Sequence, residues 1–215
     1  MIRAVLFDLD GTLADTAPDL GLALNLLRAE SGLAPVPLEQ TRPLTSSGAR
    51  GLIKAGFGYT TEHPDYPRLK DRFLELYGLN ICVDTRLFEE MDLLLESLEG
   101  RKLTWGVVTN KAARFTDPLI QALGLSTRAA CVVSGDTTPR AKPAPDPLLY
   151  AAKLIGLSPS DCIYVGDDLR DIQAARAAGM GALAAAYGYL GDDGNPEDWG
   201  ADGVIRSPIE VLQYL

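Results

Sequence analysis

Short apolar runs alternate with amphipathic stretches along most of the chain, and this alternation restricts the fold more than any other feature. The runs at 2–7, 103–108, 129–133, 162–165 and 181–185 have the length and continuous apolar character of strands buried on both faces. The stretches that repeat apolar residues at helical spacing are 87–98, 115–122, 148–155, 172–178 and 208–215. Strands that alternate with helices predict an α/β protein, with a doubly wound parallel sheet and helices on both of its faces.

The segment 17–83 interrupts this alternation, because it is helical in character and contains no strong strand pattern. Leu20 and Leu24 lie four residues apart, as expected on one face of a helix. We therefore expect an inserted helical cap domain at 17–83, and a core α/β domain formed by 1–16 and 84–215.

The charge balance limits the partners of the protein. The chain of 215 residues carries 29 acidic and 20 basic residues, which gives a formal net charge of −9. Nucleic-acid binding depends on Lys and Arg side chains against phosphates, so no nucleic-acid surface is expected. We expect a small-molecule substrate, bound where positive charge is locally concentrated, and a monomer or homodimer.

Cysteine content and hydropathy predict a cytoplasmic protein. Cys82, Cys131 and Cys162 are odd in number and include no C-x-x-C pair, which indicates reduced thiols in a reducing compartment. The first residues run directly into the first expected strand and leave no room for a signal peptide. No apolar stretch approaches the roughly 18 residues of a transmembrane helix, so no membrane contact is expected.

Two carboxylates, Asp8 and Asp10, directly follow the first expected strand. If the extended geometry continues through them, both side chains point to the same side. Two like charges at such a distance resist joint ionisation unless a cation or a shared proton relieves them. The plain alternative is an ordinary turn at Asp10-Gly11, with Asp8 as a helix cap.

Three other expected strands also end at polar residues, namely Thr109, Ser134 and Asp167. Parallel strands end at one edge of the sheet, where open α/β sheets bind ligands, so these residues are expected to converge with Asp8. Carboxylates that bind a divalent cation such as Mg²⁺, together with Lys142, form a suitable set for handling a phosphoryl group. Either aspartate at the first strand end could attack phosphorus, and the other would then transfer protons.

Each of these residues also has a purely structural explanation. Lys142 alone suits a solvated loop before a proline, and Thr109 and Asn110 suit a turn at a strand end. The acidic cluster at 167–171 suits helix capping, which accounts for one of its three aspartates but not for all of them. We favour the functional interpretation because these residues all follow strand ends of the same expected sheet.

Four motifs resemble those of the haloacid dehalogenase superfamily and occur in the same order. They are Asp8-Leu9-Asp10-Gly11-Thr12-Leu13, Val107-Val108-Thr109-Asn110-Lys111, Lys142-Pro143-Ala144-Pro145-Asp146-Pro147 and Val165-Gly166-Asp167-Asp168-Leu169-Arg170-Asp171. The resemblance covers nearly the whole core and implies a Rossmann-like fold with phosphatase chemistry. It implies that Asp8 is the nucleophile, Asp10 the general acid and base, Thr109 and Asn110 phosphate binders, and Lys142 the stabiliser of charge.

The same resemblance implies a Mg²⁺ site. The cation would be held by Asp8, the backbone carbonyl of Asp10, and Asp167. Asp171 would lie behind these ligands and orient them. Asp168 differs from the family pattern, because many relatives have Ser at this position. We expect Asp168, like Asp171, to lie behind the residues that bind the cation directly.

The position of the cap resembles that of phosphoglycolate phosphatases, and the tail at 187–202 is similar to that of N-acetylmuramic acid 6-phosphate phosphatases. The resemblance implies a phosphomonoesterase that forms an aspartyl-phosphate and acts on a phosphoglycolate-like metabolite. The alternative is an N-acetylmuramic acid 6-phosphate phosphatase of cell-wall recycling. Arg50, in the candidate cap loop 46–50, is expected to bind a substrate carboxylate bidentately, although a surface arginine early in a helix is an equal alternative.

Other classes explain the residues less well. A haloacid dehalogenase would use Asp8 against carbon and leave Asp10 without a role. A phosphonate-cleaving enzyme with Lys54 as its Schiff base would also lack the second aspartate, and Thr12 resembles the phosphatase form rather than the mutase form. A non-catalytic binding module on this scaffold would be expected to have lost a motif, yet all four are present.

Overall fold

A six-stranded sheet forms the centre of the molecule in the computed structural model, which describes residues 1–191 and 194–215. Its strands lie in the order β5-β4-β1-β6-β7-β8, and all neighbouring pairs are parallel. The strands are β1 (Ala4–Phe7), β4 (Thr104–Val108), β5 (Val132–Val133), β6 (Cys162–Gly166), β7 (Gly181–Ala185) and β8 (Gly203–Ile205). The predicted parallel α/β sheet is therefore confirmed, with β1 near its centre.

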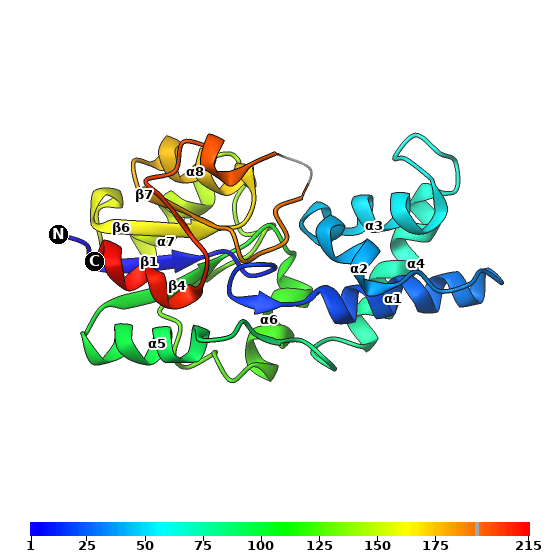
Figure 1. The fold of residues 1–215 in the computed structure, drawn as a ribbon, viewed down its shortest axis with the longest axis horizontal. Helices are drawn as coiled ribbons and strands as arrows, with labels where there is room; N and C mark the ends of the chain where they lie inside the picture. The colour runs from blue at the N-terminus through cyan, green and yellow to red at the C-terminus, as the bar shows by residue number, and fades with distance from the viewer. Residues whose placement is uncertain (192–193) are drawn as a thin grey trace.

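Helices cover both faces of this sheet (Figure 1). On one face, α5 (Met91–Gly100) and α6 (Ala113–Ala122) pack with the 3₁₀ helix η4 (Pro208–Tyr214). On the other face lie α7 (Asp146–Leu154) and α8 (Leu169–Ala178). In β1, Val5 and Phe7 belong to the first apolar cluster and Leu6 to the second, because successive side chains of a strand point to opposite faces.

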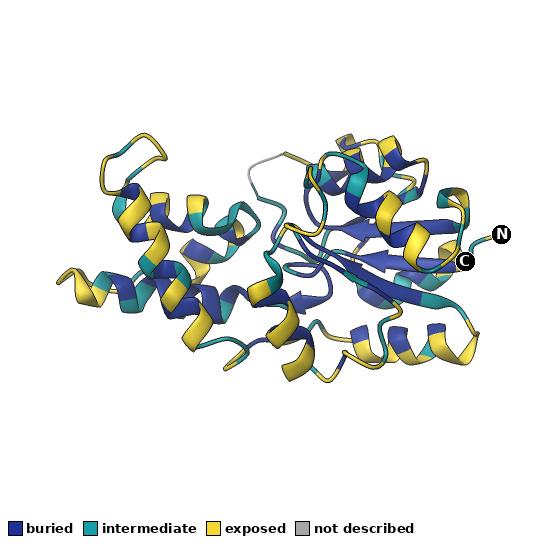
Figure 2. Cartoon of the chain, turned by 180° about the vertical axis from the view of Figure 1, so that it is seen from behind, coloured by how far each residue is buried: buried dark blue, intermediate teal, exposed yellow. Residues whose placement is uncertain are grey.

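A helical unit lies beyond the end of the sheet at which β1 points (Figure 1). It consists of α1 (Ala17–Glu30), α2 (Leu38–Thr41), the 3₁₀ helix η1 (Arg42–Ser47), α3 (Gly48–Phe57) and α4 (Tyr66–Leu79). Leu24, Ile53 and Phe73 are among its buried residues, and Phe115 of α6 packs with them. Figure 2 shows buried residues concentrated in the strands and on the inward faces of the helices.

The helical unit is connected to the core through a small antiparallel pair of strands. β2 (Ala14–Asp15) leads into α1, and β3 (Arg86–Leu87) follows α4, with Ala14 opposite Leu87 and Asp15 opposite Arg86. The chain therefore leaves the core and returns to it at adjacent backbone positions.

The structure differs from the predicted elements in four places. Leu87 lies in β3, and α5 begins only at Met91, because Leu87 pairs with Ala14. β5 is restricted to Val132–Val133, and the three-residue strand β8 was not predicted, because its run is too short to stand out. The segment expected as a closing helix at 208–215 forms the 3₁₀ helix η4, which is consistent with its short length.

Candidate active site

The turn after β1 presents Asp8 and Asp10 at the carboxyl edge of the sheet. The Asp8 amide donates to the Val165 carbonyl at 2.9 Å, so the ladder to β6 continues one residue past β1. The chain then turns at Gly11, whose φ of +84° favours glycine. A side chain at Gly11 would also collide with the Asp167 carboxylate, so the turn packs directly against the end of β6.

Lys142 is buried between two carboxylates. Its Nζ lies 2.9 Å from Asp8 Oδ1 and 2.7 Å from Asp171 Oδ1, and it donates to the Tyr164 hydroxyl at 2.7 Å. Burial alone would lower the pKa of Lys142, but the two carboxylates outweigh it and raise that pKa, so the ammonium stays charged. Lys142 is thus a fixed positive charge beside Asp8.

Asp8, Asp167 and Asp171 form a compact carboxylate cluster. One oxygen from each lies within 4.8 Å of the others. Burial, reinforced by Asp8 and Asp171, raises the pKa of Asp167 well above its usual range. Burial likewise raises the pKa of Asp171 to about 7, although Lys142 opposes the shift. Closely spaced carboxylate oxygens that disfavour joint ionisation suit a hard divalent cation, so this cluster fits Mg²⁺.

The Asp10 carboxylate has a different set of partners. Its Oδ1 lies 2.9 Å from Lys111 Nζ and accepts a hydrogen bond from the Thr16 hydroxyl at 2.5 Å. Lys111 Nζ also lies 4.7 Å from the centre of the Tyr77 ring, which belongs to α4. Lys111 was given no role in the sequence analysis, although its position directly after Thr109 and Asn110 could have indicated one.

Thr109 and Asn110 follow β4 and line the same cavity as Asp8. The Thr109 hydroxyl accepts a hydrogen bond from the Lys111 amide at 3.2 Å. The Asn110 side chain donates to the Lys142 carbonyl and accepts from the Lys142 amide, both at 3.0 Å. Asn110 therefore holds the loop that carries Lys142.

Asp168 caps helix α8 and pairs with Arg170. Its Oδ1 accepts from the Arg170 amide at 2.8 Å, and the guanidinium contacts both carboxylate oxygens, at 2.7 and 2.6 Å. Burial tends to raise the pKa of Asp168, but the hydrogen bonds from Arg170 outweigh it and lower that pKa. Asp171 completes the capping box, because its Oδ2 accepts from the Asp168 amide at 3.2 Å. Helix capping, the structural explanation for this acidic cluster, therefore accounts for Asp168 and for one carboxylate oxygen of Asp171.

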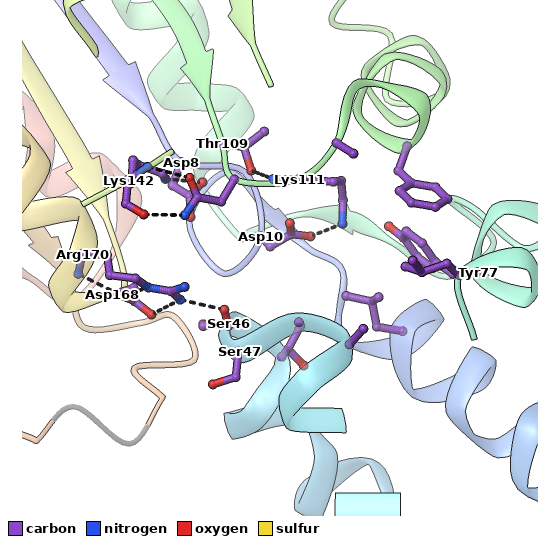
Figure 3. Close-up of a pocket in the computed structure, with 18 of the residues that line it drawn as sticks. Asp8, Asp10, Ser46, Ser47, Tyr77, Thr109, Lys111, Lys142, Asp168 and Arg170 are labelled. Atoms are coloured by element: carbon purple, nitrogen blue, oxygen red, sulfur yellow. Dashed lines mark hydrogen bonds and ion pairs between the residues drawn. The ribbon is translucent and has the colours of Figure 1, made fainter. Parts of the chain in front are cut away.

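Ser46, the fifth residue of η1, connects the helical unit to the site. Its hydroxyl donates to Asp167 Oδ2 at 3.1 Å, and its carbonyl accepts from the Arg170 guanidinium at 2.8 Å. Figure 3 shows the Arg170 side chain in contact with Ser46, with Asp8 and Lys142 at the ends of the core strands. The sequence pattern placed Ser46 in the candidate cap loop but gave no signal for these contacts.

A cavity of about 440 Å³ lies between the helical unit and the core. Its walls include five predicted site residues, namely Asp8, Asp10, Thr109, Asn110 and Lys142. Asp168 and Asp171, which were expected behind the metal ligands, also line it, and so does Arg170, which was not predicted. This volume is within the range typical of small-molecule sites.

Three residues expected at the site do not line this cavity, namely Arg50, Ser134 and Asp167, although Asp167 belongs to the carboxylate cluster with Asp8. Arg50 lines a second hollow in the helical unit together with Lys54, Thr60 and Thr61. Ser134 is buried, and its amide donates to the Thr137 hydroxyl at 2.9 Å. The structure therefore does not bring Arg50 to the carboxylate cluster, because it lies on α3, away from the loop end at Ser46.

A parallel α/β sheet that brings Asp8, Asp10 and the buried Lys142 to one cavity has the arrangement of an enzyme active site. The chain belongs to the haloacid dehalogenase-like hydrolase family, whose model matches residues 5–185. Its relatives further define it as a phosphoric monoester hydrolase.

Similar proteins carry two different substrate names. The chain is 42% identical over 214 residues to an N-acetylmuramic acid 6-phosphate phosphatase from Pseudomonas aeruginosa, covering 100% of this chain and 95% of that protein. It is 42% identical over 212 residues to a phosphoglycolate phosphatase from Xanthomonas campestris, covering 98% and 95%. A crystal structure of a predicted phosphoglycolate phosphatase from Haemophilus somnus superposes with a TM-score of 0.86 at 27% identity, covering 99% and 97%.

Within the described residues, no helix is both long and apolar enough to span a membrane.

Proposed function

We propose that this protein is a Mg²⁺-dependent phosphomonoesterase that forms an aspartyl-phosphate on Asp8. The observation that carries the proposal is the pairing of Asp8 with the buried ammonium of Lys142, beside a second aspartate with different partners. We also propose that it acts on a small phosphorylated carboxylic acid in the cytoplasm, which agrees with three free cysteines.

Asp8 is the nucleophile because its carboxylate lies beside Lys142 at the floor of the cavity. One carboxylate oxygen attacks phosphorus, and the ester P–O bond breaks as the acyl-phosphate forms. Lys142 keeps its charge in this buried position, so it orients the incoming phosphate dianion and offsets its charge.

Asp10 transfers the protons. It protonates the leaving alkoxide as the ester bond breaks, and it then removes a proton from the water that hydrolyses the acyl-phosphate. Lys111 and Thr16 fix the position of its carboxylate through contacts that Asp8 does not make, which suits separate roles for the two aspartates.

Asp8, Asp167 and the backbone carbonyl of Asp10 would hold the cation, which supplies positive charge to the phosphoryl oxygens when it is bound. The hydroxyl of Thr12 donates to Asp167 Oδ1 at 3.0 Å, and the Tyr189 amide donates to Asp167 Oδ2 at 2.9 Å. These bonds fix the orientation of the Asp167 side chain. Asp171 positions Lys142 from behind.

The two candidate substrates are phosphoglycolate, the substrate implied first by the sequence, and as the second candidate N-acetylmuramic acid 6-phosphate. Relatives with both names have similar identity to this chain, so identity does not decide between them. The size of the cavity, about 440 Å³, favours the second candidate, because a two-carbon acid would fill only a small part of it.

Turnover of p-nitrophenyl phosphate by the wild-type protein and by Asp8→Asn, each with Mg²⁺ and after EDTA treatment, tests the reaction. We expect wild-type turnover with Mg²⁺, and a loss of at least about 10³-fold in Asp8→Asn or after EDTA. Activity that survives complete removal of metal, or an Asp8→Asn protein with wild-type turnover, would refute the proposal. A haloacid control excludes dehalogenation, which would release halide and leave phosphate esters intact.

A further inference from the structure

The site cavity is lined by five cationic side chains, although the chain as a whole is acidic. Three of them are committed to carboxylates of the site, since Lys142 pairs with Asp8 and Asp171, Lys111 with Asp10, and Arg170 with Asp168. The other two are Lys70 and Arg114. Within residues 1–191 and 194–215, neither of these two forms an ion pair.

Lys70 and Arg114 come from two helices, α4 and α6, that contact each other through Tyr77 and Phe115. Lys70 lies on α4 of the helical unit, and Arg114 lies in the first turn of α6 of the core. Both are exposed, whereas Lys142 is buried, so their charges lie toward the solvent side of the cavity. A substrate phosphate at Asp8 would leave both cations free for another part of the same molecule.

Apolar and aromatic side chains line the cavity alongside these two cations. Phe73 and Tyr77 follow Lys70 at helical spacing on α4, and both line the cavity. The Arg114 guanidinium lies 4.7 Å from the centre of the Phe115 ring, and that ring lies 5.5 Å from the ring of Tyr77. The lining therefore combines a phosphoryl site, an aromatic wall that suits a carbon skeleton, and two unpaired cations.

We propose that Lys70 and Arg114 bind a carboxylate of the substrate, at the opposite end of the molecule from its phosphate. The substrate class is then a phosphorylated acid with a body of about hexose size, whose carboxylate is several bonds away from the phosphate ester. A guanidinium binds a carboxylate through two parallel hydrogen bonds, and an ammonium adds a point charge. The proposal rests on the proposed phosphomonoesterase function, and it assigns to Lys70 and Arg114 the role expected from the sequence for Arg50.

A matched pair of substrates isolates this role. N-acetylmuramic acid 6-phosphate and N-acetylglucosamine 6-phosphate differ only in the lactyl ether that carries the carboxylate. We would measure kcat/KM for both substrates in the wild-type protein, Arg114→Gln and Lys70→Gln. Arg68→Gln is the control, because Arg68 lies on the same helix as Lys70 but does not line the cavity.

The wild-type protein should prefer the carboxylated sugar, and each cavity variant should lose about tenfold or more in kcat/KM for it. The same variants should keep kcat/KM for N-acetylglucosamine 6-phosphate within about twofold, as should the control for both substrates. An equal loss of kcat/KM for both sugars would show that Lys70 and Arg114 have a merely structural role, and it would overturn their assignment to the substrate carboxylate. An unchanged ratio of the two kcat/KM values would overturn it as well.

Two further substrates, p-nitrophenyl phosphate and 2-phosphoglycolate, separate the failure of this proposal from the failure of the proposed function. If p-nitrophenyl phosphate is not hydrolysed, the phosphatase function itself fails. If p-nitrophenyl phosphate is hydrolysed but 2-phosphoglycolate is preferred over both sugars, the function stands and the extended substrate class is overturned.

Discussion

Asp8 and Asp10 are two residues apart, yet the structure gives their carboxylates different neighbours. Asp8 pairs with Lys142 and lies in the cluster with Asp167, whereas Asp10 contacts Lys111 and Thr16. The spacing alone left open which aspartate attacks phosphorus. The neighbours support Asp8, because of these two aspartates it is the one whose carboxylate lies beside Lys142.

This separation of partners makes Asp10→Asn informative. We expect kcat to fall by about 10² to 10⁴, because the amide cannot transfer protons. Affinity for Mg²⁺ should stay close to that of the wild type, since only the backbone of Asp10 is assigned to the cation. Isothermal titration calorimetry with Mg²⁺ checks this, and a large loss of affinity would show that the Asp10 side chain holds the metal.

Residues at strand ends were easier to predict from the sequence than residues of the helical unit. Asp8, Lys142 and Asp167 belong to segments whose place at one sheet edge follows from parallel topology. Arg50 was placed by its position in a loop, and helical periodicity does not say how a helical unit is oriented over a sheet. The role of Lys70 could not be predicted for the same reason, because on sequence alone Lys70 is one surface lysine of an amphipathic helix.

At the scale of elements, the most direct contact between the helical unit and the core runs from η1 to the start of α8. Arg170 donates to the Ser46 carbonyl at 2.8 Å while its guanidinium also binds Asp168, so the capping residues of α8 hold η1 in place. A second contact joins Arg42 of η1 to Asp15 of β2 at 2.8 Å. We propose that substrate enters when these contacts open, with hinges at 16–18 and 82–84.

Arg170→Ala should loosen the contact between η1 and the core. We expect KM to rise several-fold and amide hydrogen exchange at 42–47 to become faster, because the helical unit loses a charge-assisted bond to the core. Arg176→Ala is the matched control, since Arg176 lies on the same helix and pairs with Asp202 instead. Unchanged exchange at 42–47 in Arg170→Ala would contradict this role for Arg170.

Elements with long periodic patterns could be predicted from the sequence, and short ones could not. α8 was predicted because its apolar residues repeat at helical spacing, and β6 because it is a continuous apolar run. β2, β3 and β8 each contain two or three residues, so their pairing depends on neighbours that are distant in the sequence. Such strands carry too little local pattern to be recognised without the tertiary structure.

At the scale of the whole molecule, cation binding should be visible as stability. The carboxylates of Asp8, Asp167 and Asp171 repel one another in the folded state, and a bound cation relieves that repulsion. Mg²⁺ at 100 times its Kd should add about 2.7 kcal/mol, which corresponds to a rise in Tm of about 5 to 10 °C for a chain of this size.

Differential scanning fluorimetry with and without Mg²⁺ checks this effect without any substrate. Asp167→Asn should lose most of the rise, because one of the proposed ligands is removed. A full rise in Asp167→Asn would place the cation elsewhere.

Stability in acid should depend in part on Glu99, which joins α5 to two other segments. Its Oε1 accepts from Trp105 Nε1 at 3.0 Å and from Arg128 Nε at 2.9 Å. The hydrogen bond from Arg128 is the largest cause that holds the pKa of Glu99 below its usual 4.5. A carboxyl whose pKa is lower in the folded state stabilises the fold above pH 4.5, and this contribution is lost as the pH falls through the folded pKa.

Glu99→Gln should therefore lower Tm at pH 7, and the difference from the wild type should shrink as the pH falls below about 4. Thermal melts between pH 7 and pH 3 measure it. Glu96→Gln is the control because Glu96 lies on the same helix and forms no ion pair within residues 1–191 and 194–215, so it should show a smaller difference at pH 7. A Glu99→Gln difference that is constant across this range would rule out the ionic contribution.

Because β2 pairs with β3, we expect the helical unit to be exchangeable between relatives. The chain leaves the core at Asp15 and returns at Arg86, which are opposite each other, so a replacement segment needs only two adjacent attachment points. A chimera that carries a relative's helical unit between these positions would keep Asp8, Asp10 and Lys142 on an unchanged sheet. Most of the substrate recognition would be transplanted with the segment, and Arg114 would be the part of it that the host chain retains.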